Sequence, residues 1–373
     1  MNLDKIKACL ILGSYLDTLG FNNGYWEFNF YKKISNLRDA MLVQNEIINH
    51  YYSLGGPCIN ISSWNASDDT IMMIATKIAC DKNATINNFK EQYLKILSTL
   101  KDKKRASGYT TIKSLEKLKN NKKINYENIM GGNGAAMRTA YIGIKFHKPF
   151  QIDELIETSI ASSRLTHNYP LAFLGGLVTA LFTSYAINDI NPFSWAKNLM
   201  ELEKSGKIDN YMKQTNIYEK YKKDKNEFFQ FWSKYIEQRL DRIQIRPREF
   251  LFSGDRYKDL LNYTPGVILG SKNVDFSKFA STGVGATIVA YDSLLMSIIS
   301  VTDIEKIDNI FSLKNYNKLN FNWNNLIFFS TLHFGDNDST GIIAGNWFGA
   351  LRGFKDIENK NRILNELEFK KFL

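Results

Sequence analysis

Two short acidic segments near opposite ends of the chain carry side chains that could bind a metal ion. In the segment HFGDNDSTG, Asp336 and Asp338 lie two residues apart and Ser339 follows directly. A loop that leads into a helix can direct two carboxylates and a hydroxyl towards one point, and Mg²⁺ prefers about six oxygen ligands. The same residues could simply cap the helix, because Asp and Ser are common N-caps. This segment alone leaves both interpretations open.

The second acidic segment favours the metal interpretation. Ser67, Asp68 and Asp69 precede the apolar run IMMIATKIAC, so they also stand where a helix should begin. Burying adjacent carboxylates is costly unless a cation or the helix dipole compensates their charge. The two segments together predict a divalent-metal site, provided that the fold brings them together in space.

Glu27 and His167 are two further ionisable residues that could contribute to a site. Glu27 lies between Trp26 and Phe28, where it is either an exposed loop acid or a desolvated acid whose raised pKa suits proton transfer. His167 follows a predicted helix and precedes an uncharged one, where it either has a structural role or hydrogen-bonds a ribose or phosphate. Both roles stay open for each residue.

The glycine-rich segment GGNGAAMR, residues 131–138, could bind phosphate. Glycines let backbone N–H groups approach a phosphate, which also benefits from the positive end of the helix that follows. The segment lacks the Lys-Ser/Thr pair of a P-loop and a preceding strand, so it supports neither common nucleotide-binding fold.

Helices must position all of these groups. The chain has only six prolines and no sustained apolar–polar alternation, which favours a mostly α-helical protein. A second small-residue loop, residues 280–286, leads into the apolar run IVAYDSLLMSII. Without a long Pro- or Ser-rich linker, we expect a single domain over residues 1–373. The periodicity predicts helices over residues 1–20, 36–54, 87–100, 110–119, 151–164 and 171–186.

Glycines recur at every fourth residue after the last acidic segment, at Gly341, Gly345, Gly349 and Gly353. Each interior glycine costs a helix roughly 0.5–1 kcal/mol relative to alanine. The stripe therefore predicts that another helix backbone approaches closely, which would place the acidic loop at the buried centre of the protein. The neighbouring Trp347 and Phe348 are expected to fill the core.

Composition limits the partners and the location. The net charge is +10, but the lysine-rich runs lie among Asn, Glu and Asp, so we expect no nucleic-acid partner. The uncharged stretch 170–186 is shorter than the ~20 residues that a bilayer span needs, so we expect a buried core helix and no membrane association. Three cysteines without metal-site spacing favour a reducing, cytoplasmic location.

Taken together, the motifs resemble the ADP-ribosylglycohydrolase family, and within it the ADP-ribosylarginine hydrolases. The resemblance covers nearly the whole chain, because its motifs occur in order from start to end. It is carried by LDTLGFNNGYWEF, SDDT at 67–70, GGNGAAMR at 131–138, SRLTH at 163–167, IVAYD, and HFGDNDST with IAGNWFG.

The resemblance implies an all-α orthogonal multi-helix bundle with a central dinuclear metal site. It implies two Mg²⁺ ions, with Mn²⁺ as an alternative because both accept oxygen-rich sites. The ligands that it implies are Ser67, Asp68, Asp69, Asp336, Asp338 and Ser339.

The resemblance also implies residues that contact the substrate. Glu27 corresponds by position to the family's early glutamate near the scissile ribose. The expected substrate-binding residues are Gly132, Asn133, Gly134 and His167, together with Ser281 and Gly283 of the 280–286 segment.

These implications define a functional hypothesis. The chain would be a monomeric, Mg²⁺-dependent hydrolase that removes ADP-ribose from arginine side chains of mono-ADP-ribosylated proteins. Metal-activated water would attack the anomeric carbon, with Asp69 or Asp338 steering the water and Glu27 orienting substrate or handling a proton. The alternatives are hydrolysis of serine-linked or O-acetyl-ADP-ribose, and a catalytically weak ADP-ribose-binding protein. Val284 and Gly285 stand where arginine-specific relatives are expected to carry a His-Asp pair, which keeps the linkage open.

Overall fold

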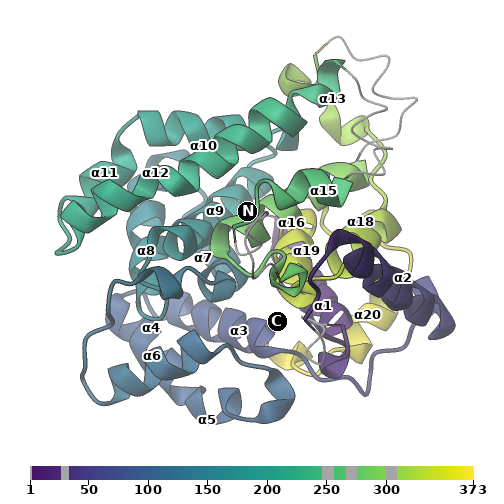
Figure 1. Cartoon of the computed structure of the whole chain (residues 1–373), viewed down its shortest axis with the longest axis horizontal. Coiled ribbons are helices and arrows are strands. Elements are labelled where there is room, and N and C mark those ends of the chain that lie inside the picture. Colours follow the sequence, from purple (N-terminus) through teal and green to yellow (C-terminus); the bar gives the residue numbers. More distant parts are fainter. Residues whose placement is uncertain (1, 27–32, 246–255, 266–274, 299–308) are drawn as a thin grey trace.

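The computed structural model describes residues 2–26, 33–245, 256–265, 275–298 and 309–373. Within these ranges the chain is helical and forms no β-strand, and one isolated bridge pairs Gly132 with Thr282 (Figure 1). The predicted all-α fold is confirmed.

The described α-helices are α1 (Leu3–Phe21), α2 (Leu37–Ser53), α3 (Asp68–Asp81), α4 (Ile86–Lys95), α5 (Leu97–Leu100), α6 (Tyr109–Lys119), α7 (Ala140–Lys145), α8 (Ile152–Arg164), α9 (Pro170–Ile187), α10 (Trp195–Lys204), α11 (Lys207–Met212), α12 (Tyr218–Tyr235), α13 (Arg242–Ile245), α15 (Arg256–Leu261), α16 (Gly283–Ile298), α18 (Trp323–Thr331), α19 (Asn337–Arg352) and α20 (Lys360–Glu366).

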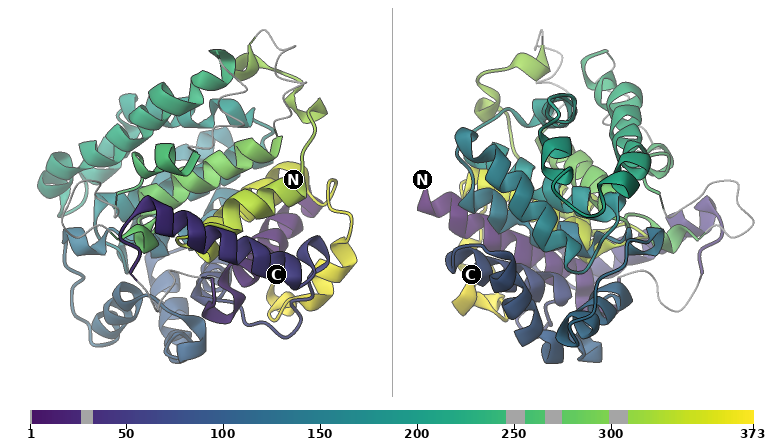
Figure 2. Two further views of the ribbon diagram at one scale, coloured as in Figure 1. Left: turned by 45° about the vertical axis from the view of Figure 1, so that its right-hand side comes forward. Right: turned by 90° about the vertical axis from the view of Figure 1, so that its left-hand side faces the viewer.

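The helices are arranged around a central group formed by α1, α9, α16 and α19. Helices α10, α12 and α13 lie on one side of this group, at the top of Figure 1, and α3 to α6 lie on the opposite side. Figure 2 keeps the same vertical order in two further views. The described buried apolar side chains form one contiguous hydrophobic cluster.

Helices α1 and α19 pack with direct backbone contact, although more than 300 residues separate them in the chain. A Cβ atom placed on Gly341 would lie 2.7 Å from the carbonyl oxygen of Leu16, and one placed on Gly345 would lie 2.6 Å from that of Leu12. This confirms the close approach that the glycine stripe predicts. Gly353 differs, because it ends α19 with a φ of +64° that favours glycine.

Helix α9 runs through the core, as predicted for residues 170–186. In the described part of the chain it is the one helix long and apolar enough to cross a membrane, and 89% of that span is buried inside the protein. Its Phe182 ring lies 5.3 Å, centroid to centroid, from the rings of Tyr291 and Trp347. Trp347 and Phe348 are both fully buried, which confirms their expected place in the core.

Two predicted boundaries are wrong. The helix predicted over residues 87–100 is interrupted at Ile96, which has a φ of −89° and a ψ of 0° and separates α4 from α5. The second half of the predicted loop 280–286 is helical, because α16 begins at Gly283 and the Thr282 hydroxyl accepts a hydrogen bond from the Gly285 N–H at 3.2 Å. Small residues there serve close helix packing and not loop conformation.

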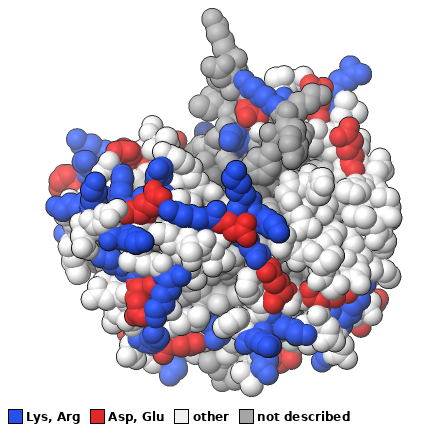
Figure 3. All heavy atoms as spheres, turned by 90° about the horizontal axis from the view of Figure 1, so that it is seen from below, with Lys and Arg blue, Asp and Glu red and all other residues white. Residues whose placement is uncertain are grey.

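Charged side chains of both signs are interspersed over the face in Figure 3. Several exposed lysines pair with a nearby carboxylate, for example Lys101 with Glu116 and Lys207 with Asp153. Such exposed pairs contribute little to stability. The surplus of positive charge is therefore distributed over this face among negative groups.

Candidate active site

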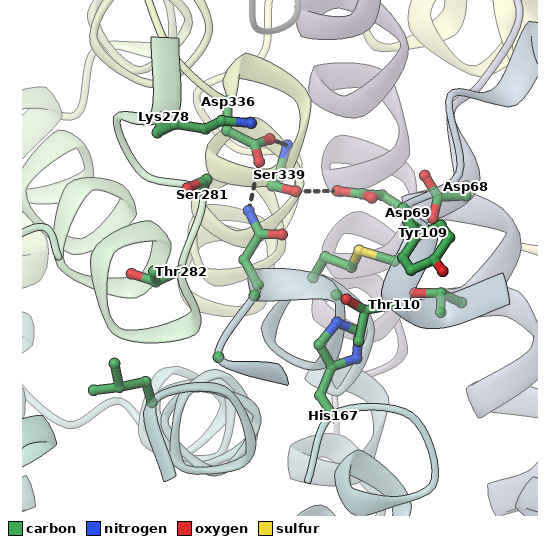
Figure 4. A pocket seen from close by; sticks show the side chains of 18 of the residues that line it. Asp68, Asp69, Tyr109, Thr110, His167, Lys278, Ser281, Thr282, Asp336 and Ser339 are labelled. Atoms are coloured by element: carbon green, nitrogen blue, oxygen red, sulfur yellow. Dashed lines mark hydrogen bonds between the residues drawn. The ribbon is translucent and has the colours of Figure 1, made fainter. Parts of the chain in front are cut away.

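A cavity of about 400 Å³ opens where the first turns of α3, α6 and α19 meet the glycine-rich segment and the residues before α16. Figure 4 shows its polar lining, in which side chains from both acidic segments face His167 across the cavity. Its volume lies in the usual range of small-molecule sites. The described carboxylates that line the cavity are Asp68, Asp69, Asp336 and Asp338.

The two acidic segments meet in space, as the metal hypothesis requires. The Ser339 hydroxyl at the start of α19 donates a hydrogen bond to Oδ2 of Asp69 at the start of α3, at 2.8 Å (Figure 4). Asp336 is the N-cap of α19, and Ser67 is the N-cap of α3. These residues therefore cap their helices, and the two acidic segments also meet at one point. The capping and metal-site interpretations do not exclude one another.

Asp17 of α1 is a third source of negative charge at this point. Ligand oxygens of Asp17, Asp69 and Asp338, hereafter the acidic trio, all lie within 4.8 Å of one another. The Ser67 hydroxyl donates to Oδ1 of Asp17 at 2.5 Å, and the Thr70 hydroxyl donates to Oδ2. Asp17 was not among the site residues predicted from the sequence. Its position as the one charged residue in the stretch 8–21 could have pointed to a role at the site.

Burial and mutual repulsion raise the pKa values of these carboxylic acids. Burial, followed by the negative charge of Asp338, raises the pKa of Asp17 to about 7 and that of Asp68 to about 8. Burial and neighbouring carboxylates raise the pKa values of Asp69 and Asp338 well above the usual range. The hydrogen bonds to the trio come from hydroxyl and backbone N–H groups, which do not cancel its charge. A cation would remove this electrostatic cost.

The glycine-rich segment is joined to the acidic site. The Asn133 side-chain amide donates to Oδ2 of Asp336 at 2.6 Å and to the Ala280 carbonyl at 3.1 Å. Its backbone N–H donates to the Ser281 carbonyl at 3.2 Å. The cavity is lined by Gly132, Asn133, Gly134 and Ser281, so the structure brings these four predicted substrate-binding residues together.

His167 lies on the other side of the glycine-rich segment. A Cβ atom placed on Gly134 would lie 2.5 Å from Cε1 of the ring, so the ring occupies the space that a larger residue would need. The side chain is 3% exposed and lines the cavity. Burial, with a smaller effect from Arg138, lowers the pKa of His167 to about 3, so the ring is neutral at physiological pH.

A sequence model described as ADP-ribosylglycohydrolase matches residues 2–372. The chain belongs to the ADP-ribosylglycohydrolase family. A Dictyostelium discoideum protein named ADP-ribosylhydrolase ARH1 is 34% identical over all of this chain and 92% of its own length. The putative ADP-ribosyl glycohydrolase L444 of Acanthamoeba polyphaga mimivirus is 31% identical over 95% of this chain and 66% of its own length.

A solved structure, named ADP-ribosylglycohydrolase-related protein complex, shares the fold. It superimposes with a TM-score of 0.53 at 12% sequence identity and covers 99% of this chain and 93% of its own. Membership of the ADP-ribosylglycohydrolase family makes this chain a hydrolase of ADP-ribosyl groups.

Two residues expected from the ADP-ribosylglycohydrolase resemblance have surroundings that differ from the others, and a third, Glu27, lies outside the described residues. Ser67 is fully buried and does not line the cavity, because its hydroxyl is engaged with Asp17 and with the backbone N–H of Asp69. Gly283 packs on α9, where an added Cβ atom would lie 2.5 Å from the Leu171 carbonyl oxygen, and it also does not line the cavity.

Asn337 shapes the acidic loop. Its side-chain amide donates to the carbonyl oxygens of His333 and Trp26, at 2.7 and 2.9 Å, and its side-chain carbonyl accepts from the His333 N–H. Phe334 packs against Phe279 with a centroid distance of 5.0 Å. Neither side chain lines the cavity, so both support the loop from outside it.

Proposed function

We propose that this protein removes ADP-ribose from arginine side chains of mono-ADP-ribosylated proteins and needs two Mg²⁺ ions, or Mn²⁺, to do so. The observation that carries the proposal is the acidic trio. Three buried carboxylates from three separate helices approach within 4.8 Å at one end of a cavity whose other end is formed by a glycine-rich segment. This arrangement is unfavourable without a cation and suits hard divalent ions.

The residues present fit such ions. Every donor at the site is an oxygen atom, and burial has already removed the water that would otherwise solvate the carboxylates. Bound there, divalent ions would supply Lewis-acid activation of water and a fixed position for the ribose hydroxyls. The residues that would hold them are Ser67, Asp68, Asp69, Asp336, Asp338 and Ser339, with Asp17 as a further candidate.

The chain's own residues would position the attacking water and the substrate. Because Ser339 already donates to Oδ2 of Asp69, Oδ1 is the oxygen that we assign to hold a water molecule and accept its proton. The glycine-rich segment and His167 would hold the pyrophosphate and ribose of ADP-ribose at the opposite end of the cavity.

Two observations support arginine as the leaving group. The motifs listed for the ADP-ribosylarginine hydrolases run through the whole chain, and the similarity to the Dictyostelium ADP-ribosylhydrolase covers the same length.

A linkage panel tests the proposal. Arginine-linked, serine-linked and O-acetyl-ADP-ribose are offered in parallel, and free ADP-ribose is measured with Mg²⁺, with Mn²⁺ and with EDTA. We expect release from the arginine linkage, loss of release in EDTA, and recovery on adding metal. Asp68→Asn and Asp338→Asn should abolish release, whereas Asp81→Asn, a matched change at an exposed carboxylate, should not.

The panel also separates the alternatives. Release only from serine or acetyl substrates would reject the arginine linkage and keep the metal chemistry. Binding of ADP-ribose without release from any substrate would indicate a binding protein. Equal turnover by wild type and Asp338→Asn would reject the metal site.

A further inference from the structure

Arg138, the last residue of the glycine-rich segment, is a buried cation without a carboxylate among its hydrogen-bond acceptors. Its side chain is fully buried and lies 4.8 Å from the centroid of the Tyr93 ring. Nη1 donates to the carbonyl of Gly134 at 2.5 Å, and Nη2 donates to the carbonyl of Ser162 at 3.1 Å. Nη2 also donates to the hydroxyl oxygen of Thr166 at 2.8 Å. The guanidinium thus holds both the glycine-rich segment and the residue before His167.

The contact with Arg138 fixes the direction of the Thr166 hydroxyl. A guanidinium can only donate hydrogen bonds, so Oγ1 of Thr166 must act as the acceptor in this pair. The hydroxyl has one proton of its own to donate, and Nδ1 of His167 lies 2.8 Å from Oγ1. Among the described residues no other acceptor contacts this hydroxyl. The proton therefore points to Nδ1.

The direction of the Thr166 hydroxyl then fixes the tautomer of His167. A ring nitrogen that accepts a hydrogen bond carries no proton, so in the neutral ring the proton lies on Nε2. Nε2 has no hydrogen-bond partner in the described part of the chain, and the side chain lines the cavity. A Cβ atom placed on Gly134 would lie 2.9 Å from Nε2, and one placed on Gly132 would lie 3.5 Å from it. The N–H group is therefore aimed along the glycine-rich segment into the cavity.

We propose that Arg138 and Thr166 are positioning residues that hold His167 as the neutral Nε2–H tautomer, which donates a hydrogen bond to a pyrophosphate oxygen of the ADP-ribosyl group. The identity of this acceptor rests on the proposed function. Phosphate oxygens only accept hydrogen bonds at neutral pH, so the opposite tautomer would place two lone pairs against each other. The low pKa of His167, caused by burial and by Arg138, keeps the ring neutral, and so the bond forms without an imidazolium.

The first measurement is the tautomer itself. Long-range ¹H–¹⁵N NMR spectra of the free, full-length protein at pH 7 distinguish protonated from unprotonated ring nitrogens, and the chain has only four histidines to assign. The His167 signals are identified by their loss in His167→Gln. We expect an unprotonated Nδ1 and a protonated Nε2, without change between pH 6 and 8. A protonated Nδ1, or an imidazolium in this range, would overturn the proposal.

The second measurement is the affinity for ADP-ribose by titration calorimetry. Thr166→Val removes the hydroxyl at nearly constant volume, and Thr166→Ser keeps it. Thr183→Val is the matched control, because Thr183 is also fully buried and its hydroxyl donates only to the backbone of α9. We expect Thr166→Val to weaken ADP-ribose binding about threefold to tenfold, which is the usual effect of losing one such hydrogen bond. Thr166→Ser and Thr183→Val should bind like the wild type.

The outcomes separate this proposal from the proposed function. Equal ADP-ribose affinity in wild type and Thr166→Val, with Thr166→Val folded by circular dichroism, would overturn the positioning role. If Thr166→Val does not fold, the wild-type spectrum and Thr166→Ser still decide the tautomer. Absence of ADP-ribose binding by the wild type would instead reject the proposed function, and the spectrum would still decide the positioning of the ring.

Discussion

Two groups of buried carboxylates in this protein have opposite electrostatic surroundings. Asp292 of α16 is fully buried and contacts Nε of Arg239 at 2.5 Å and Nε of Arg256 at 2.8 Å, while the Tyr235 hydroxyl donates to it at 3.1 Å. Burial alone would raise its pKa, but the two arginines outweigh burial and lower it. The acidic trio is equally buried, yet hydroxyl and N–H groups are its partners and its pKa values are raised.

The difference shows how the protein divides its buried charge between folding and function. The charge of Asp292 is neutralised within the chain, so this cluster can stabilise the fold without any ligand. The acidic trio is instead held by hydroxyl and N–H groups, and under the proposed function a bound cation would relieve the repulsion among its carboxyl groups. Four experiments test this difference between the Asp292 cluster and the acidic trio.

The largest expected effect is on catalysis at the acidic trio. Asp338→Asn should lower the rate of ADP-ribose release by about 10³-fold or more, because a metal site contributes several kcal/mol to transition-state stabilisation. The same change should leave the metal-free protein at least as stable as the wild type, since it removes one repelling charge. Release assays and urea unfolding in EDTA measure the two effects. If Asp338→Asn is active, or is markedly less stable than the wild type in EDTA, the acidic trio does not differ from the Asp292 cluster in the expected way.

The opposite result is expected at Asp292. Asp292→Asn should destabilise the protein by about 3–5 kcal/mol, because it removes the nearest counter-charge of two buried arginines. Urea unfolding measures this loss, and Tyr235→Phe, which removes one hydrogen bond to the same carboxylate, should cost only about 1 kcal/mol. Release of ADP-ribose per folded molecule should be unchanged. Loss of activity in folded Asp292→Asn would show that the two clusters are not separate in function.

Added Mg²⁺ should stabilise the folded protein by binding at the acidic trio and not at the Asp292 cluster. At a concentration of 100 times its dissociation constant, Mg²⁺ should stabilise the wild type by about 2.7 kcal/mol through binding to the folded state alone. The same increment should appear in Asp292→Asn and be absent from Asp338→Asn. Thermal unfolding with and without Mg²⁺ tests this, and equal stabilisation of all three proteins would mean that the ion binds elsewhere.

The smallest expected effect is a pH dependence of opposite sign at the two clusters. In the folded protein the pKa of Asp17 is raised from 3.8 to about 7 and that of Asp68 from 3.8 to about 8. Groups with raised acid pKa values stabilise the fold most when protonated, so their contribution is lost as pH rises from about 4 to about 8.

The contribution of Asp292 has the reverse sign, because its pKa is lowered. That contribution is present above pH 3.8 and is lost only as pH falls below this value. In EDTA, the wild type should therefore become less stable between pH 5 and 8, and Asp338→Asn should show a weaker trend. Urea unfolding across this range is the measurement. Stability that rises with pH in EDTA would reject the raised pKa values.

The sequence was sufficient to predict the fold class and the meeting of the acidic segments. The glycines that recur every four residues from Gly341 onwards predict that the backbone of a second helix lies in contact with this stripe. In the structure that helix is α1. Asp69 and Asp338 both stand at helix starts, and this local position, together with the family motifs, was visible without coordinates. The glycine prediction succeeded because it depends on spacing within one helix, whereas the meeting of the acidic segments was predicted from their shared chemistry and from the family motifs.

Three features that depend on contacts between distant elements were missed. Asp17 is the one charged residue in the stretch 8–21, and only the packing of α1 against α3 and α19 brings it to the acidic site. Gly283 looks like part of a flexible loop, yet its role in the structure is to let α16 approach α9. The contact from Arg138 through Thr166 to His167 likewise requires the glycine-rich segment and the end of α8 to be placed in three dimensions.

The backbone contact between α1 and α19 has a consequence for how the protein is made. Residues 3–21 are synthesised well before residues 337–352, which cover them. Until α19 has been made, α1 presents an apolar face that carries Asp17, and contacts of such long sequence separation form slowly. We therefore expect the acidic site to form only after α19 has been synthesised.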